Sequence, residues 1–149
     1  DLTILRPVTV CGYSPSMRLD VAVNALTFSA LKKNKIKVFG GKQIRPNLNM
    51  DDMIDAYIFF IKRKFKKDRK TKDTIFNIGF ENLSILNIAK RINRCLLEKY
   101  KIDIFKSNDL RSYRQDSSRI LSIGFKPKKK IEDAIMDIKK KYFQNIIKN

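Results

Sequence analysis

Apolar residues along this chain alternate between short β-branched runs and longer stretches with helical spacing. Segment 2–10 is a β-rich run that stops before Gly12, which indicates a buried strand leading into a loop. Because proline cannot donate a ladder hydrogen bond, Pro7 predicts that the strand ends near it or leaves that position unpaired. In segment 20–33, by contrast, apolar residues recur every three or four positions, which indicates a helix, and Asn34 is a suitable C-cap.

The same reasoning predicts eight elements in strict alternation. Strands are predicted over 2–10, 36–39, 74–78 and 102–105, and helices over 20–33, 51–65, 84–100 and 131–147. Ser84 is the predicted cap of the third helix, whose expected inward residues are Ile85, Ile88, Ala89, Ile92, Leu96 and Leu97. This order indicates an α/β architecture. Two strong strands are few for an independent sheet, so we expect the chain to be the tail of a longer one.

Charge is the most unusual feature of the composition. The chain has 33 Lys and Arg against 15 Asp and Glu, a net charge of +18, and eight of the basic residues fall within 62–72. A basic nucleic-acid-binding domain is therefore one alternative. The basic run holds a single aromatic residue, Phe65, and follows a predicted helix, so a solvated helix end is the favoured interpretation and nucleic acid an unlikely partner.

Little catalytic chemistry is visible in the residues. The absence of His excludes a His-based triad or a His-ligated zinc site. Cys11 and Cys95 lie in apolar contexts and are expected to be buried, and such sparse Cys usage suits a reducing compartment, the cytoplasm. Asp51 and Asp52 are adjacent and favour a helix start over a shared site. We therefore assign no catalytic and no metal-binding residue, and no apolar run approaches the ~20 residues of a membrane helix.

Isolated arginines stand out in loops. Arg18 precedes a helix, Arg45 is expected in a Gly-rich loop after Gly40-Gly41, and Arg111 and Arg114 follow the last predicted strand. A guanidinium can bind phosphate oxygens through two parallel hydrogen bonds. Each arginine taken singly is more simply a surface cation, so spacing alone assigns no site.

Six segments, taken in order, resemble motifs of one family. They are 5–12 (LRPVTVCG), 14–24 (SPSMRLDVAVN), 36–52 (IKVFGGKQIRPNLNMDD), 76–79 (FNIG), 109–114 (DLRSYR) and 123–128 (IGFKPK). Together they resemble the C-terminal half of the NAD-dependent epimerase/dehydratases, the extended short-chain dehydrogenase/reductases that act on nucleotide sugars. The resemblance implies one unit over 1–149: the last strands of a Rossmann-type NAD(P)-binding fold plus a small substrate-binding subdomain, without the N-terminal half. Cys11 and Asn49 depart from the aromatic or His residues usual at their positions.

The resemblance also implies roles for eight residues. Those matching positions that face the nucleotide diphosphate or the sugar are Thr9, Arg18, Asp20, Asn24, Arg45 and Arg111, and those bordering the nicotinamide of NAD or NADP are Pro7 and Val8. Arg111 matches the pyrophosphate clamp of the family, and Arg45 matches a loop arginine near the same phosphates.

Two family motifs have no counterpart in this sequence. There is no Gly-rich dinucleotide fingerprint, and no Tyr is followed by Lys four residues later. We expect both in a preceding segment, so this chain by itself should be inactive, and the strands should lack their neighbours. The complete protein could form a homodimer. A remnant that keeps only sugar-nucleotide binding is the second alternative.

Overall fold

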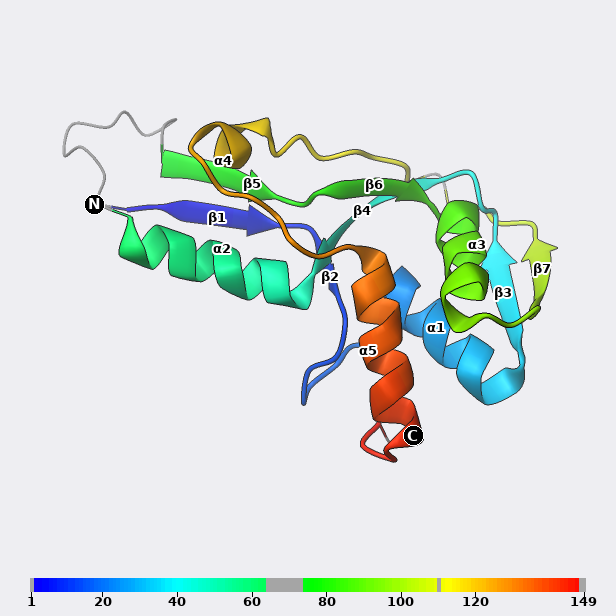
Figure 1. The fold of residues 1–149 in the computed structure, drawn as a ribbon. Helices are drawn as coiled ribbons and strands as arrows, with labels where there is room; N and C mark the ends of the chain where they lie inside the picture. The colour runs from blue at the N-terminus through cyan, green and yellow to red at the C-terminus, as the bar shows by residue number, and fades with distance from the viewer. Residues whose placement is uncertain (1, 64–73, 110, 148–149) are drawn as a thin grey trace.

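The computed structural model describes residues 2–63, 74–109 and 111–147. Strands and helices are interleaved through the whole chain (Figure 1). In order, the elements are β1 (Ile4–Pro7), β2 (Thr9–Cys11), α1 (Ala22–Lys33), β3 (Lys35–Phe39), β4 (Ile44–Asn49), α2 (Met50–Lys62), β5 (Ile75–Ile78), β6 (Glu81–Ser84), α3 (Ile85–Leu96), β7 (Lys101–Phe105), α4 (Ser118–Ser122) and α5 (Ile131–Phe143).

One hydrophobic core forms around β1 and β5, which pair in parallel. Figure 1 shows α2 running along these strands and α4 lying beside β5. Phe76 and Ile78 of β5 are buried there, and Phe60 of α2 contacts the Phe76 ring at 4.7 Å between centroids. In the described residues β1 has no strand on its other side.

A second core lies at the other end of the molecule, where α1 and α3 pack against β3 and α5 packs against α1 and α3 (Figure 1). Ile36 and Val38 of β3 and the apolar faces of the three helices are buried in it. Two small sheets complete this part: β3 pairs in parallel with β7, and β4 lies between β2, its parallel partner, and β6, its antiparallel partner. The α/β class and the parallel pairing agree with the sequence-based expectation.

Helix caps explain where several elements start and stop. The Asn49 side chain accepts a hydrogen bond from the Asp51 N–H at the start of α2, and Ser84 does the same for Asn87 in α3, as predicted for Ser84. Asn34 ends α1 in the left-handed conformation with φ of 51°, which confirms its expected C-cap role. β1 ends at Pro7, as the proline predicted.

The structure corrects several boundaries. Strands β4 and β6 and the short helix α4 are absent from the prediction, and Arg45 lies in β4 and not in a Gly-rich loop. The third helix stops at Leu96, and Leu97, expected inward, is 90% exposed because it terminates the helix with a left-handed φ of 56°. The last helix stops at Phe143, which leaves Ile146 exposed beyond it.

Two further expectations concern parts of the chain with special composition. Most of the basic run 62–72 lies outside the described residues. Among the residues that are described, no helix combines the length and apolar character needed to cross a bilayer.

Cys11 is buried as expected, and burial, aided by the nearby Glu81 carboxylate, raises the pKa of its thiol to about 12. Cys95 is half-buried.

Candidate functional site

Five of the six predicted substrate-binding residues line one hollow of about 430 Å³, called here the arginine pocket. Its walls come from β2, the segment before α1, the start of β4, β3 and the segment after β7. The lining residues used below are Thr9, Arg18, Asp20, Gln43, Arg45, Asp109, Arg111 and Tyr113. Segments separated by about a hundred positions in sequence therefore meet in one place. Asn24, the sixth predicted residue, does not line this pocket.

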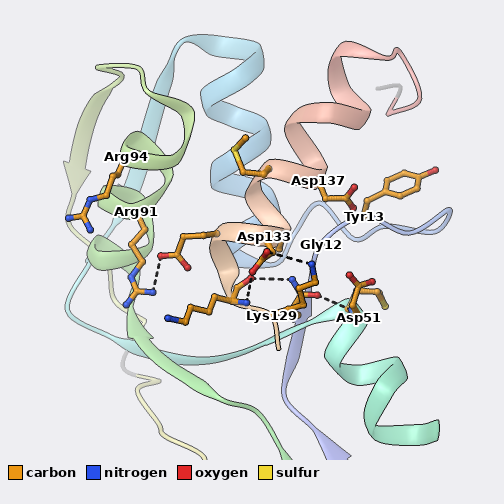
Figure 2. A pocket seen from close by; sticks show the side chains of 14 residues that line it. Gly12, Tyr13, Asp51, Arg91, Arg94, Lys129, Asp133 and Asp137 are labelled. Carbon is orange, nitrogen blue, oxygen red and sulfur yellow. Dashed lines mark hydrogen bonds and ion pairs between the residues drawn. The ribbon is translucent and has the colours of Figure 1, made fainter. Parts of the chain in front are cut away.

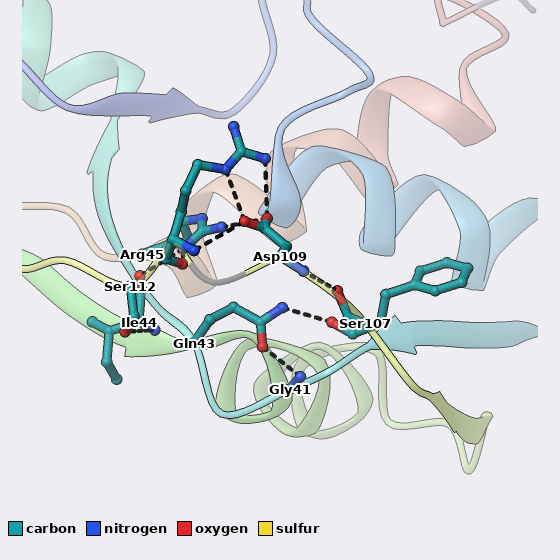
Figure 3. Close-up of polar contacts among 9 residues, drawn as sticks. Gly41, Gln43, Ile44, Arg45, Ser107, Asp109 and Ser112 are labelled. Atoms are coloured by element: carbon teal, nitrogen blue, oxygen red, sulfur yellow. Dashed lines mark hydrogen bonds and ion pairs between the residues drawn. The ribbon is translucent and has the colours of Figure 1, made fainter.

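Asp109 is at the centre of the charged groups of the arginine pocket (Figure 3). Its Oδ2 accepts from Nη2 of Arg45 at 2.8 Å and from Nη2 of Arg111 at 3.0 Å, and its Oδ1 accepts from Nε of Arg111 at 2.8 Å. The two arginines differ in exposure, because the Arg45 side chain is 16% exposed and that of Arg111 is 80% exposed. Arg111 thus extends into solvent at the pocket while Arg45 is held below it.

Arg45 is fixed by more than its ion pair. Its Nη1 donates to the carbonyl oxygens of Ile44 and Arg111, and its guanidinium lies 5.7 Å from the centre of the Tyr113 ring. Most of its donors are therefore used within the protein, so its main effect is to hold the segment that carries Asp109 and Arg111 against β4.

Two hydrogen bonds of the Ile44 backbone attach the same segment to the edge of β4. The Ile44 N–H donates to Ser112 Oγ at 2.9 Å, and the Tyr113 N–H donates to the Ile44 carbonyl at 3.3 Å. The turn before β4 is closed by Gln43, whose side chain bridges the Gly41 N–H and the Phe39 carbonyl (Figure 3). The floor of the pocket is thereby built by β4 and its preceding turn.

The two guanidinium groups hold Asp109 in its charged form. Hydrogen bonds from the Arg111 side chain and backbone, with the charge of Arg45, lower the pKa of Asp109 from 3.8 to about 2. Asp109 is therefore ionised throughout the physiological range. Two positive charges and one negative charge leave this part of the pocket with an excess of one positive charge, which suits a phosphate-bearing ligand.

The other predicted residues of the first strands and helix have different surroundings. Arg18 and Asp20 form an exposed ion pair at 2.6 Å on the rim of the pocket, which raises the pKa of Arg18 and lowers that of Asp20. Asn24 is buried, and its amide bonds the Gly12 N–H at 3.0 Å and the Arg18 carbonyl at 2.9 Å. Asn24 thus holds the loop between β2 and α1 in place and does not face the pocket.

Pro7 and Val8 lie apart from the arginine pocket, at the carboxyl end of β1. The Val8 N–H donates to the Ile78 carbonyl at 2.9 Å, and a Cβ on Gly79 would lie 2.5 Å from Val8 Cγ2. The close approach of the Val8 side chain to the Gly79 backbone accounts for glycine at position 79. Ligands of α/β sheets bind at the carboxyl ends of parallel strands, which is where Pro7 is exposed.

A larger hollow of about 690 Å³ contains none of the predicted residues (Figure 2). It lies where the first turns of α2 and α5 meet Gly12, Tyr13 and the α3 residues Arg91 and Arg94. Arg91 is already paired there, with Glu81 at 2.9 Å and Glu132 at 3.0 Å. The lining of this hollow contains as many acidic as basic side chains, so it favours neither anions nor cations.

Sequence reasoning did not assign Asp109 or Gln43 to the site. The spacing of Asp109 two residues before Arg111 was a usable signal, because an Asp side chain commonly bonds the backbone two residues on. Gln43 offered no signal of this kind, since its role depends on the turn that brings Phe39 and Gly41 together. The described residues bring no cluster of His, Cys, Asp and Glu side chains into a potential metal site.

Comparison with known proteins agrees with this architecture. A curated relative, the UDP-glucose 4-epimerase of Lactobacillus helveticus, is 28% identical over 125 residues, which cover 75% of this chain and 37% of that protein. The UDP-glucuronic acid 4-epimerase structure from Bacillus cereus is 24% identical with a TM-score of 0.72, covering 93% of this chain and 45% of the other. The UDP-glucose 4-epimerase structure from Thermotoga maritima is 18% identical with a TM-score of 0.75, covering 97% and 47%.

These similarities concern part of each relative, because the chain spans less than half the length of the proteins it matches. The structural matches show a shared α/β fold. Residues 1–79, more than half of the chain, match the sequence profile of the family described as the NAD dependent epimerase/dehydratase family. The chain therefore belongs to the NAD-dependent epimerase/dehydratase family.

Proposed function

We propose that this chain is the C-terminal, substrate-binding half of an NAD(P)-dependent nucleotide-sugar epimerase or dehydratase, and that the arginine pocket binds the diphosphate of the nucleotide sugar. The observation that carries the proposal is the meeting of Thr9, Arg45 and Arg111 in one hollow with an excess of positive charge. Arg111 is the residue best placed to contact the diphosphate, because its guanidinium is exposed. Arg45 supports it from below, and Arg18 and Asp20 form the rim.

The relatives supply the chemical class of the ligands. The Bacillus cereus structure contains UDP-glucuronic acid and NAD, and the Thermotoga maritima structure contains UDP-glucose. In this chain Pro7 and Val8 would border the nicotinamide, since they form a largely apolar surface at the carboxyl end of β1. Bound NAD(P) would supply transient oxidation of the sugar, and the catalytic Tyr and Lys would come from a preceding segment.

One side of β1 has no partner strand among the described residues, which supports the existence of that segment. Leu5 of β1, with Tyr57, Phe60 and Ile61 of α2, lines an apolar hollow of about 360 Å³. Ile54, Tyr57, Ile58 and Ile61 form an exposed stripe along α2. An apolar helix face beside a free strand edge is the surface that further strands and helices of the same sheet would cover. We thus assign residues 1–149 to the last strands of the Rossmann sheet and the substrate subdomain.

Binding of UDP to the complete protein by isothermal titration calorimetry tests the proposal. Arg111→Ala should weaken UDP binding by roughly 1.5–3 kcal/mol, the range for a hydrogen bond to a charged group. Arg114→Ala is the matched control, because Arg114 is exposed three residues away and does not line the arginine pocket. If both variants lost the same amount of UDP affinity, UDP would be held by the general positive charge of the surface, as in nucleic-acid binding. That result would contradict the proposal.

The sequence that precedes residue 1 in the coding DNA gives an independent test. A Gly-rich fingerprint and a Tyr-x-x-x-Lys motif there would support the proposed half-enzyme. A complete protein without them that still binds UDP would be a sugar-nucleotide-binding remnant without redox chemistry.

A further inference from the structure

Arg111 does not point freely into solvent, although its side chain is the most exposed of the charged groups at Asp109. Its Nε and Nη2 bind the two oxygens of the Asp109 carboxylate in a fork at 2.8 Å and 3.0 Å. This is the same two-pronged geometry by which a guanidinium binds a phosphate. The carboxylate therefore occupies one of the two edges through which the Arg111 guanidinium can bind a diphosphate, the edge formed by Nε and Nη2.

Asp109 itself stays in place by contacts that do not involve the Arg111 side chain. Its Oδ2 also accepts from Arg45 at 2.8 Å, and its Oδ1 also accepts from the Arg111 backbone N–H at 3.1 Å. The Arg45 guanidinium is held in turn by two backbone carbonyls. If the Arg111 side chain swings away, Asp109 keeps an ion pair and a backbone hydrogen bond. Arg111 is thus the movable member of the three, and Asp109 and Arg45 are the fixed ones.

We propose that Asp109 is a positioning residue. It holds the Arg111 guanidinium at the arginine pocket through the two-bond fork, an arrangement called parking here, until a diphosphate replaces the Asp109 carboxylate. The proposal rests on the proposed function for its ligand and goes beyond it by giving an internal competitor to that ligand. Parking keeps a long side chain in one orientation at the pocket. It also lowers affinity for anions that bind the Nε/Nη2 edge of Arg111, since each of them has to replace the carboxylate that is already bound there.

The contacts predict opposite effects for two substitutions in the same segment. Asp109→Asn keeps the shape of the side chain and one acceptor for the Arg111 N–H, but it removes the negative charge and one prong of the fork. It should therefore tighten binding of inorganic pyrophosphate about fivefold, which corresponds to losing the attraction between the unit charges of Asp109 and Arg111 at about 4 Å in water. Ser112→Ala removes the hydrogen bond from Ile44 and leaves all charges unchanged. It should weaken pyrophosphate binding, because it loosens the segment that carries Arg111.

Parking can be observed without any ligand. In the complete protein labelled with ¹⁵N-arginine, the Nε–H of a parked Arg111 should exchange slowly with solvent. This signal is assigned by its loss in Arg111→Ala. Asp109→Asn should speed the exchange severalfold, and inorganic pyrophosphate should shift the Arg111 signal in the unsubstituted protein. Unchanged exchange in Asp109→Asn would overturn the parking role, whether or not UDP binds.

The double variant separates positioning from simple charge. If Asp109 acts through Arg111, Asp109→Asn should tighten pyrophosphate binding only where Arg111 is present, and the gain should vanish in an Arg111→Ala background. A gain that persists without Arg111, or a loss of affinity in Asp109→Asn alone, would overturn the proposal. Slow exchange of the Arg111 Nε–H in a protein that does not bind UDP would sustain parking and refute the proposed function instead.

Discussion

The carboxylate of Asp52 joins two segments that are far apart in the chain. Asp52 lies in the first turn of α2, and its side chain is buried, with the residue 1% exposed. Its Oδ1 accepts from the Lys128 N–H at 2.9 Å and its Oδ2 from the Lys129 N–H at 3.0 Å. Both donors belong to the segment that leads into α5. Asp52→Ala would remove both acceptors at once and leave the exposed Lys128–Asp55 ion pair, at 2.8 Å, to attach that segment to α2.

The size of the effect follows from these two bonds. A hydrogen bond to a charged group contributes about 1.5–3 kcal/mol to stability. Lys128 and Lys129 are exposed, so their freed N–H groups would regain water and the loss should fall at the lower end of the sum. We expect Asp52→Ala to lower the free energy of unfolding by about 3 kcal/mol. An acidic residue in a first helical turn adds about 0.3–1 kcal/mol through the helix dipole.

Asp51→Ala provides the matched control, because Asp51 is an exposed acidic residue of the same helical turn. It should cost only the dipole contribution, below about 1 kcal/mol. Equilibrium urea unfolding of the complete protein and of both variants, followed by circular dichroism, measures the difference. Equal losses in Asp51→Ala and Asp52→Ala would refute the reasoning, because they would show that the two buried hydrogen bonds add nothing to the helix-dipole effect.

Three further predictions follow from single sites. Gly79→Ala should destabilise the protein by roughly 1–3 kcal/mol through its clash with Val8, and the added substitution Val8→Ala should recover part of the loss in the same urea assay. Arg111→Ala should raise the pKa of Asp109 from about 2 toward 3.8, as followed by NMR of the carboxyl carbon. In the unsubstituted protein the stabilisation from this ion pair is present above pH 3.8 and is lost as the pH falls through about 2. Leu97→Asn should raise the thermal midpoint, because position 97 is exposed with a left-handed φ of 56° that Asn tolerates better than Leu; a lower midpoint would show that Leu97 contributes packing in the complete protein.

Elements with a strong local signal were predictable from the sequence. The α1 helix and its Asn34 cap, the Ser84 cap of α3 and the end of β1 at Pro7 each depend on residues within one turn or one strand. Strands β4 and β6 were missed for the opposite reason. Their sequences IRPNLN and ENLS are short and contain Pro, Asn and Glu, which are depleted in strands. They become strands because β4 pairs with both β2 and β6.

The α/β order of elements, the excess of positive charge and, through six ordered motifs, the family could all be predicted from the sequence. It also selected five residues that share one pocket. Which of the six predicted substrate-binding residues line that pocket, and what each side chain contacts, depended on the tertiary structure. Asn24 bonds backbone groups, Arg45 supports a neighbouring segment, and Asp109 binds Arg111, because these roles depend on contacts between residues distant in the chain. Such contacts arise from the pairing of strands and the packing of helices, which a local pattern of residues does not specify.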